Sequence, residues 1–190
     1  MKCKHAHPCG PNAPSPWVER FAPLIRAEGA VLDVAAGAGR HSRLFLQLGH
    51  PVTAIDRDTS MLAPAPGFEI IKADLEGLDP WPLPGRHFAG IVVTNYLFRL
   101  LWPHLLDSLD ETGILIYETF SEGHEHFTQA KPRNPDHLLR SGELLEVVRG
   151  KLSVIAFEQG IVQRDKGPAV VQRLCAARGP GPHVVNPPGA

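Results

Sequence analysis

The sequence lacks a long apolar run, a strong charge of either sign and a large number of cysteines. No uninterrupted apolar stretch approaches the ~20 residues that a membrane-spanning helix needs. The 190 residues carry 19 lysines and arginines against 20 aspartates and glutamates, so no overall basic field favours nucleic acid, although a local basic patch stays open. Only three cysteines occur, and the first residues form no apolar secretion segment. We therefore expect a cytoplasmic protein with reduced cysteines and no membrane association.

Proline and glycine, by contrast, are well represented. The 19 prolines and 18 glycines cluster near both ends and between apolar segments, as short connections require. The length is that of one domain. We expect an irregular arm over residues 1–15, a single domain over 16–178 and a disordered, proline-rich tail over 179–190.

The most specific pattern lies in residues 31–40, VLDVAAGAGR. An apolar run ends in Asp33, and a turn of small residues with Gly37 and Gly39 follows. An amphipathic stretch then leads to a second apolar run, which ends in Asp56. Two parallel strands need such a crossover between them. Small residues let the backbone approach a ligand, and an acid at the tip of the second strand can bind two ribose hydroxyls. The pattern therefore predicts a site for a cofactor that contains a nucleoside.

A nicotinamide dinucleotide is one alternative for this cofactor. Its fingerprint, G-x-G-x-x-G, requires a third glycine. In this chain Ser42 stands at that position, which counts against a nicotinamide-linked oxidoreductase.

The segment instead resembles the first motif of the class I S-adenosylmethionine (SAM)-dependent methyltransferases, in which Leu-Asp precedes x-Gly-x-Gly-x-Gly. Asp33, Gly37 and Gly39 match this motif, and Ala35 replaces its first glycine. We expect this replacement to be mild, because alanine adopts most backbone conformations, although not a left-handed one. Within the class, the chain looks most similar to small single-domain bacterial members, including the tellurite-resistance type. The resemblance covers roughly residues 30 to 176.

The resemblance implies which residues hold SAM. Asp56 matches the acid that binds the ribose, and Met61 with Leu62 matches the apolar pair that covers the adenine. Asp74 matches the third-strand acid that accepts from the adenine amino group, although it could also be a helix cap or a plain surface acid. The implied cofactor-binding residues are Asp33, Ala35, Gly37, Gly39, Asp56, Arg57, Met61, Asp74, Leu75 and Thr94.

Methyl transfer from a sulfonium asks the protein mainly to align a nucleophile with the methyl group, at about 3 Å. The family places the residues nearest this methyl after its fourth strand, where this chain has Thr94, Asn95 and Tyr96. A general base is needed only if the acceptor must lose a proton. His124, in the long polar loop after the fifth predicted strand, is a candidate base, and a solvated loop histidine is the alternative. The candidate catalytic residues are therefore Asn95, Tyr96 and His124.

The implied fold is α/β: a Rossmann-like, doubly wound sheet of seven strands in the order 3-2-1-4-5-7-6, with strand 7 antiparallel. The residue pattern predicts strands at about 30–34, 51–55, 68–74, 88–94, 113–118, 152–157 and 169–176. It predicts helices from Pro16, over 40–48, over 98–109 with a bend at Pro103 and over 136–149 with a break at Ser141-Gly142, and a helical turn around 59–63. The last two strands form a hairpin, which a dinucleotide-binding fold would not need.

The N-terminal arm contains four side chains of the types that bind zinc, Cys3, His5, His7 and Cys9. Their alternate spacing would direct them to opposite sides of an extended segment, so we expect no metal site there.

The sequence thus predicts a SAM-dependent methyltransferase that moves the methyl group by in-line displacement to a small-molecule or soft nucleophile. Two alternatives stay open: an RNA or protein methyltransferase that needs a partner for recognition, and a SAM-binding module without catalysis. The sequence also leaves open whether the protein is a monomer or a homodimer.

Overall fold

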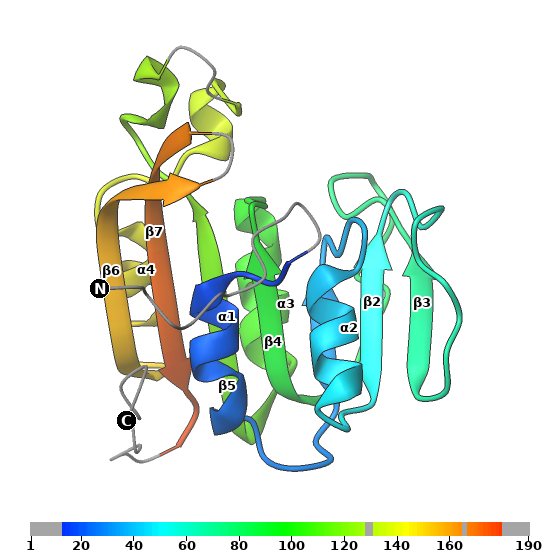
Figure 1. Cartoon of the computed structure of the whole chain (residues 1–190). Helices are drawn as coiled ribbons and strands as arrows, with labels where there is room; N and C mark the ends of the chain where they lie inside the picture. The colour runs from blue at the N-terminus through cyan, green and yellow to red at the C-terminus, as the bar shows by residue number, and fades with distance from the viewer. Residues whose placement is uncertain (1–12, 128–130, 165–166, 180–190) are drawn as a thin grey trace, which may run out of the picture.

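The computed structural model describes residues 13–127, 131–164 and 167–179. One sheet of seven strands runs through the molecule in the order β3-β2-β1-β4-β5-β7-β6, as Figure 1 shows. β7 is antiparallel to both of its neighbours, and the other pairs are parallel. The predicted α/β fold and strand order are therefore confirmed. The strands are β1 Val31–Val34, β2 Val52–Asp56, β3 Phe68–Lys72, β4 Phe88–Thr94, β5 Leu109–Phe120, β6 Ser153–Arg164 and β7 Gly167–Ala177.

Helices cover both faces of the sheet (Figure 1), α1 and α2 on one face and α3 and α4 on the other. Ser15 starts α1 because its side chain accepts a hydrogen bond from the Trp17 N–H, and Pro16 suits the first turn. The α-helices are α1 Pro16–Phe21, α2 Arg40–Gln47, α3 Trp102–Asp107 and α4 Glu143–Val148. Four 3₁₀ turns are described in addition, η1 Ala22–Leu24, η2 Arg99–Leu101, η3 His124–His126 and η4 Pro135–His137.

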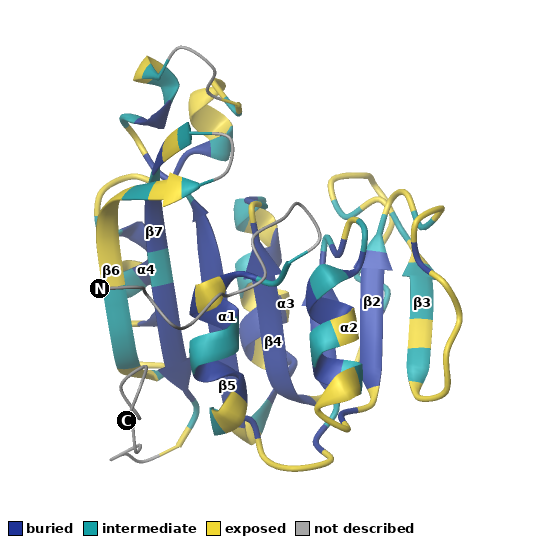
Figure 2. Ribbon diagram, viewed as in Figure 1, coloured by how far each residue is buried: buried dark blue, intermediate teal, exposed yellow. Residues whose placement is uncertain are grey.

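Each face of the sheet has its own core, because successive residues of a strand point to opposite faces. On the α1/α2 face, Val31 and Val92 pack with Phe21 and Phe45. On the other face, the strands pack against the apolar residues of α3 and α4. Figure 2 shows the result: the central strands are buried, while β3 and β6, at the two edges, are partly exposed. The central strands are therefore fixed firmly, and their carboxyl ends form a stable base for a site.

Several elements differ from the predictions. The expected helical turn at 59–63 is a single hydrogen-bonded turn closed by Leu62 N–H to Thr59 O (3.0 Å). Pro103 does not bend a long helix; it lies in the first turn of α3, where its missing N–H costs nothing. The helix expected over 136–149 forms only from Glu143: Leu138 is extended, and Gly142, with φ at +71°, directly precedes α4. β6 extends well beyond its predicted end at 157, to Arg164, whereas β7 lies close to its predicted range of 169–176.

Within the described residues, we find no helix with the length and apolar character of a membrane span. Cys3, His5, His7 and Cys9 lie outside the described residues. Among those described, no group of three or more His, Cys, Asp or Glu side chains could hold a metal ion.

Candidate functional site

The site begins with the turn that follows β1. The strand order reverses between β1 and β4, and ligands of such sheets bind at this reversal, beyond the carboxyl ends of the strands. Ala35, Gly37 and Gly39 all have positive φ, at +53°, +55° and +71°. Ala35 is therefore in the left-handed conformation that alanine tolerates poorly, so its replacement of glycine is not the mild change expected from the sequence.

The two glycines of the turn have different surroundings. A Cβ built on Gly39 would lie 2.6 Å from the end of the Leu62 side chain, so any other residue would force that side chain to move. A Cβ built on Gly37 would meet no described atom within 4 Å. Gly37 thus borders open space at the strand ends, where a ligand can approach the backbone.

Asp33 lies beneath this turn and is buried. Its Oδ2 accepts hydrogen bonds from the Ser42 N–H (2.9 Å) and the Ser42 hydroxyl (2.6 Å). Burial raises the pKa of Asp33 to about 6, although the bonds from Ser42 oppose this shift. Ser42, the residue that departs from the dinucleotide fingerprint, therefore ties the start of α2 to the end of β1.

Asp56 links the tip of β2 to the same turn. Its Oδ2 accepts from the Gly37 N–H (2.7 Å), and its Oδ1 accepts from the Asp58 N–H (2.9 Å). An ionised carboxylate has about four lone-pair positions, so further acceptor capacity remains. The structure therefore brings the predicted ribose acid next to the glycine that borders open space.

The other residues predicted to hold the cofactor lie around this point. Asp74 is exposed after β3 and accepts from the Glu76 N–H (3.0 Å). Arg57 is exposed, Leu75 is half-buried and the Met61 side chain is 69% exposed. Met61 is thus free to cover a planar ring, whereas its neighbour Leu62 packs in a small cluster with Ala36 and Ala54.

Thr94, at the end of β4, contacts a buried histidine that sequence reasoning missed. The Thr94 Oγ1 lies 3.3 Å from Nδ1 of His41, and Nε2 of His41 accepts from the Ser15 N–H (3.1 Å). Because the Ser15 N–H can only donate, the neutral imidazole carries its proton on Nδ1 and donates to Thr94. Burial, with a contribution from Arg40, lowers the pKa of His41 to about 3. His41 is therefore a neutral bridge between the N-terminal segment and β4.

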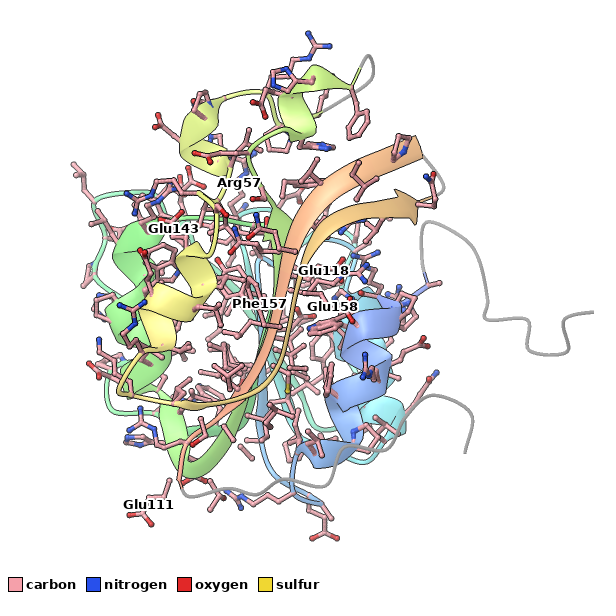
Figure 3. The ribbon with its side chains drawn as sticks, turned by 90° about the vertical axis from the view of Figure 1, so that its left-hand side faces the viewer. Arg57, Glu111, Glu118, Glu143, Phe157 and Glu158 are labelled. Atoms are coloured by element: carbon pink, nitrogen blue, oxygen red, sulfur yellow. The ribbon has the colours of Figure 1, made fainter. Side chains whose placement is uncertain are left out.

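A second missed group surrounds the buried carboxylate of Glu118 on β5 (Figure 3). The Ser15 hydroxyl donates to its Oε2 (2.8 Å), and Arg164 donates to its Oε1 (2.5 Å). Arg173 forms an ion pair with it at 3.1 Å. Arg164 also donates to Oδ1 of Asn95 (2.7 Å). These partners come from the N-terminal segment and the β6–β7 hairpin, which no local sequence pattern connects with the strand ends.

The remaining two catalytic candidates lie differently. Burial and the nearby Glu76 carboxylate raise the pKa of the Tyr96 hydroxyl, so it stays protonated at neutral pH. His124 is buried in the loop after β5, where its ring stacks on Phe120 with centroids 4.4 Å apart. Its Nε2 lies 3.3 Å from the Lys131 carbonyl oxygen. Of the three candidates, Asn95 is the one whose side chain the structure joins to the Glu118 group.

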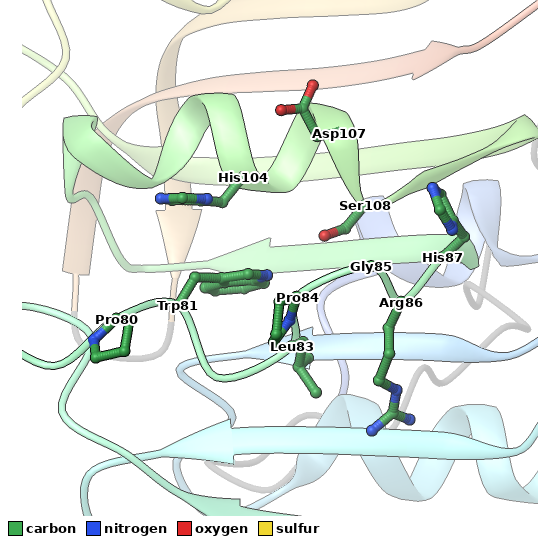
Figure 4. Close-up of a pocket in the computed structure, with 10 residues that line it drawn as sticks. All are labelled: Pro80, Trp81, Leu83, Pro84, Gly85, Arg86, His87, His104, Asp107 and Ser108. Atoms are coloured by element: carbon green, nitrogen blue, oxygen red, sulfur yellow. The ribbon is translucent and has the colours of Figure 1, made fainter.

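A groove of about 430 Å³ lies elsewhere, between the proline-rich loop before β4 and α3 (Figure 4). Trp81 stacks on His104 there, with ring centroids 5.6 Å apart. None of the predicted site residues lines this groove, so we treat it as separate from the site at the strand ends.

Comparison with known proteins gives a match in structure but not in sequence. No protein-family model matches the chain, and no curated protein sequence does. TehB from Haemophilus influenzae superposes with a TM-score of 0.65 at 16% identity, over 86% of this chain and 61% of TehB. The chain thus spans less than two thirds of the length of TehB. A SAM-dependent methyltransferase from Methanosarcina mazei superposes with a TM-score of 0.62 at 14% identity, over 87% of this chain and 98% of that one.

A third structure contains a bound ligand. It is the 1,6-didemethyltoxoflavin-N1-methyltransferase of Burkholderia thailandensis, solved with 1,6-didemethyltoxoflavin and S-adenosylhomocysteine. It superposes with a TM-score of 0.57 at 19% identity, over 85% of this chain and 76% of that one. The strand order, the reversed β7 and these superpositions agree that the chain has the fold of the class I SAM-dependent methyltransferases.

Proposed function

We propose that this protein is a SAM-dependent methyltransferase that acts on a small molecule. The observation that carries the proposal is the arrangement of Asp56 and Gly37. An acid at the tip of β2 lies within hydrogen-bond distance of a glycine that borders open space, at the point where the strand order reverses. The same fold holds S-adenosylhomocysteine in the Burkholderia protein, which supports the choice of cofactor.

The described residues suit the parts of SAM. Asp56 would accept hydrogen bonds from the ribose hydroxyls, and Asp74 would accept from the adenine amino group, with Met61 over the ring. Asp33, beneath the turn, offers a buried carboxylate for the ammonium of the methionine part. When bound, SAM supplies a methyl group that its sulfonium already activates. The chain itself therefore has to bind SAM, orient the acceptor and exclude water.

The groups near Asn95 favour an acceptor that does not need a base. His41 uses both ring nitrogens in hydrogen bonds and has a pKa of about 3. The pKa of the Tyr96 hydroxyl is raised above its usual value of 10, so this group is even less able to act as a base, and His124 packs against Phe120. We therefore propose a soft nucleophile, or one that arrives already deprotonated.

The charges around Glu118 also restrict the kind of acceptor. Glu118 has two arginine partners, Arg164 and Arg173. Burial lowers the pKa of Arg164 against the opposing effect of Glu118, and the nearby Arg173 and Arg40 lower it further. The two guanidinium groups paired with Glu118, with the charge of Arg40 acting on Arg164 as well, make this region unfavourable for a cationic acceptor.

Calorimetric titration with SAM, S-adenosylhomocysteine and NAD tests the proposal. We expect binding of SAM and S-adenosylhomocysteine and none of NAD. Asp56→Ala should weaken SAM binding by about 1–3 kcal/mol, because it removes a charge-assisted hydrogen bond. Asp58→Ala is the matched control, with the same change of charge two residues away on an exposed side chain. Binding of NAD alone, or equal effects of the two substitutions, would refute the assignment.

A further inference from the structure

The Asn95 side chain has a fixed orientation. Arg164 donates to its Oδ1 at 2.7 Å. A guanidinium has only donors, so the amide oxygen must face Arg164 and the amide NH₂ must face away from it. Asn95 is exposed, and no hydrogen bond from its NH₂ to another described residue is found. The chain thus presents a pair of directed N–H donors just past the end of β4.

The backbone of Asn95 is held as well. Its N–H donates to the carbonyl oxygen of Glu118 on β5 (2.8 Å). Its φ is +54°, a left-handed conformation that asparagine adopts more readily than most residues. It directly follows Thr94, which is tied to His41 on α2. The backbone of the residue is therefore anchored between the ends of β4 and β5.

Arg164 is itself held in place. It donates to Oε1 of Glu118 (2.5 Å), and its guanidinium lies 5.1 Å from the centre of the Phe120 ring. Glu118 is in turn fixed by Ser15 and Arg173. The orientation of the Asn95 amide thus depends on the end of β6, which lies far from it in the sequence.

We infer that Asn95 donates a hydrogen bond through its NH₂ group to the methyl acceptor, and that Arg164 is the positioning residue that turns this group toward the site. The inference rests on the proposed function and narrows its substrate class. The acceptor carries an atom that accepts hydrogen bonds, such as an oxygen, close to its nucleophilic atom. An amine held through its own N–H would meet only donors on the outward-facing NH₂ group, because the amide oxygen is turned toward Arg164.

Nuclear magnetic resonance of the full-length ¹⁵N-labelled protein, saturated with S-adenosylhomocysteine, tests this. The probes are acetate, which accepts hydrogen bonds, and methylammonium, which donates them. We expect acetate to shift the side-chain NH₂ signals of Asn95 and methylammonium to leave them in place. No shift with acetate, or a shift with methylammonium instead, would overturn the inference.

Three variants separate donation from general packing. Asn95→Asp keeps an oxygen for Arg164 but removes the NH₂ donors, and Asn95→Gly removes the side chain without adding charge at a position whose positive φ glycine accepts. Both should weaken acetate binding at least tenfold. Arg164→Gln should weaken it too and shift the NH₂ signals of Asn95, because the amide loses its fixed orientation.

Asn134→Asp is the matched control. It makes the same change of charge in an exposed residue whose side-chain oxygen likewise keeps its bond, from the Asp136 N–H (3.1 Å). It should bind acetate as the unmodified protein does. If Asn95→Asp and Asn95→Gly also do so, the inference is wrong. If S-adenosylhomocysteine does not bind the unmodified protein, the proposed function fails instead, which distinguishes the two.

Discussion

At the scale of single residues, Asp33 is buried, so ionisation of its carboxyl group destabilises the fold. Its folded-state pKa of about 6 lies above its ordinary value of 3.8. Between these values the folded protein binds more protons than the unfolded chain, so the free energy of unfolding falls as the pH rises from about 4 to 6. The raised pKa lowers the free energy of unfolding at pH 7 by about 3 kcal/mol relative to its value below pH 4. We interpret this loss of stability as the consequence of keeping a carboxylate for the ammonium group of the proposed cofactor.

Asp33→Asn tests this interpretation. An asparagine keeps an oxygen for Ser42 but carries no charge, so the variant should be more stable than the original protein at pH 7 and should lose the decline between pH 4 and 6. It should also bind SAM more weakly. Urea unfolding across this pH range, with a SAM titration at pH 7, measures both effects. Parallel stability curves for the two proteins would contradict the prediction.

Ala35 is the second residue at which the chain bears a local cost. Left-handed backbone costs a residue with a Cβ about 1–2 kcal/mol, whereas glycine loses about 0.5–1 kcal/mol of extra conformational freedom on folding. We therefore expect Ala35→Gly to be as stable as the original protein or up to about 1 kcal/mol more stable. Ala36→Gly, next to it and without a positive φ, should be less stable by about 1 kcal/mol. Chemical unfolding of both variants measures these differences. If Ala35→Gly lowers the free energy of unfolding as much as Ala36→Gly does, the prediction is wrong.

At the scale of elements, one ion pair, between the partly exposed Arg99 and the buried Glu143, joins the segment after β4 to α4. Nε and a terminal nitrogen of Arg99 bind the two carboxylate oxygens of Glu143, at 2.7 and 2.9 Å. Burial opposes ionisation of Glu143, but the hydrogen bonds from Arg99 and Arg140 outweigh it and hold the pKa of Glu143 below its usual value. Arg99 also donates to the carbonyl oxygens of Asp136 and Leu138. It therefore fixes η4 and the start of α4 against the loop that follows β4.

Removing one partner of this pair should lower the free energy of unfolding by more than removing both partners does. Arg99→Met leaves a buried carboxylate without its main partner and should lower the free energy of unfolding by about 3 kcal/mol. The double variant, with Glu143→Leu added, should recover part of this loss. A double-mutant cycle by urea unfolding measures the difference, and additive losses would show that the two side chains act independently.

At the scale of the whole molecule, the proposed cofactor should stabilise the fold because its site joins the ends of β1, β2 and β4. At a concentration of 100 times its dissociation constant, a ligand that binds only the folded state adds about 2.7 kcal/mol. Thermal unfolding with S-adenosylhomocysteine should show this gain as a raised midpoint. The gain at the same concentration should shrink in Asp56→Ala and persist in Asp58→Ala.

The sequence predicted the parts of the molecule that local patterns encode. Apolar runs identified all seven strands, and the acids and glycines between Asp33 and Asp74 marked the strand ends where the cofactor residues gather. It did not predict the left-handed φ of Ala35, because alanine gives no local signal for this conformation.

Local sequence patterns could not predict the group of residues around Asn95 and Glu118. Arg164 follows a predicted strand that ended at 157, and the observed strand runs to the arginine itself. Its partners Asn95 and Glu118 lie 69 and 46 residues away in the sequence. Ser15 caps α1, but its bonds to His41 and Glu118 arise only from tertiary packing. Charge and cap patterns carry no information on such distant pairs.

The β6–β7 hairpin therefore divides the site by origin in the sequence. The residues proposed to hold the cofactor come from one continuous stretch, Asp33 to Thr94. The partners of Glu118 come from outside this stretch: Ser15 precedes it, and Arg164 and Arg173 lie well after it. The Asn95 amide thus takes its orientation only once the hairpin has paired with β5, so this side of the site is complete only when the sheet is complete.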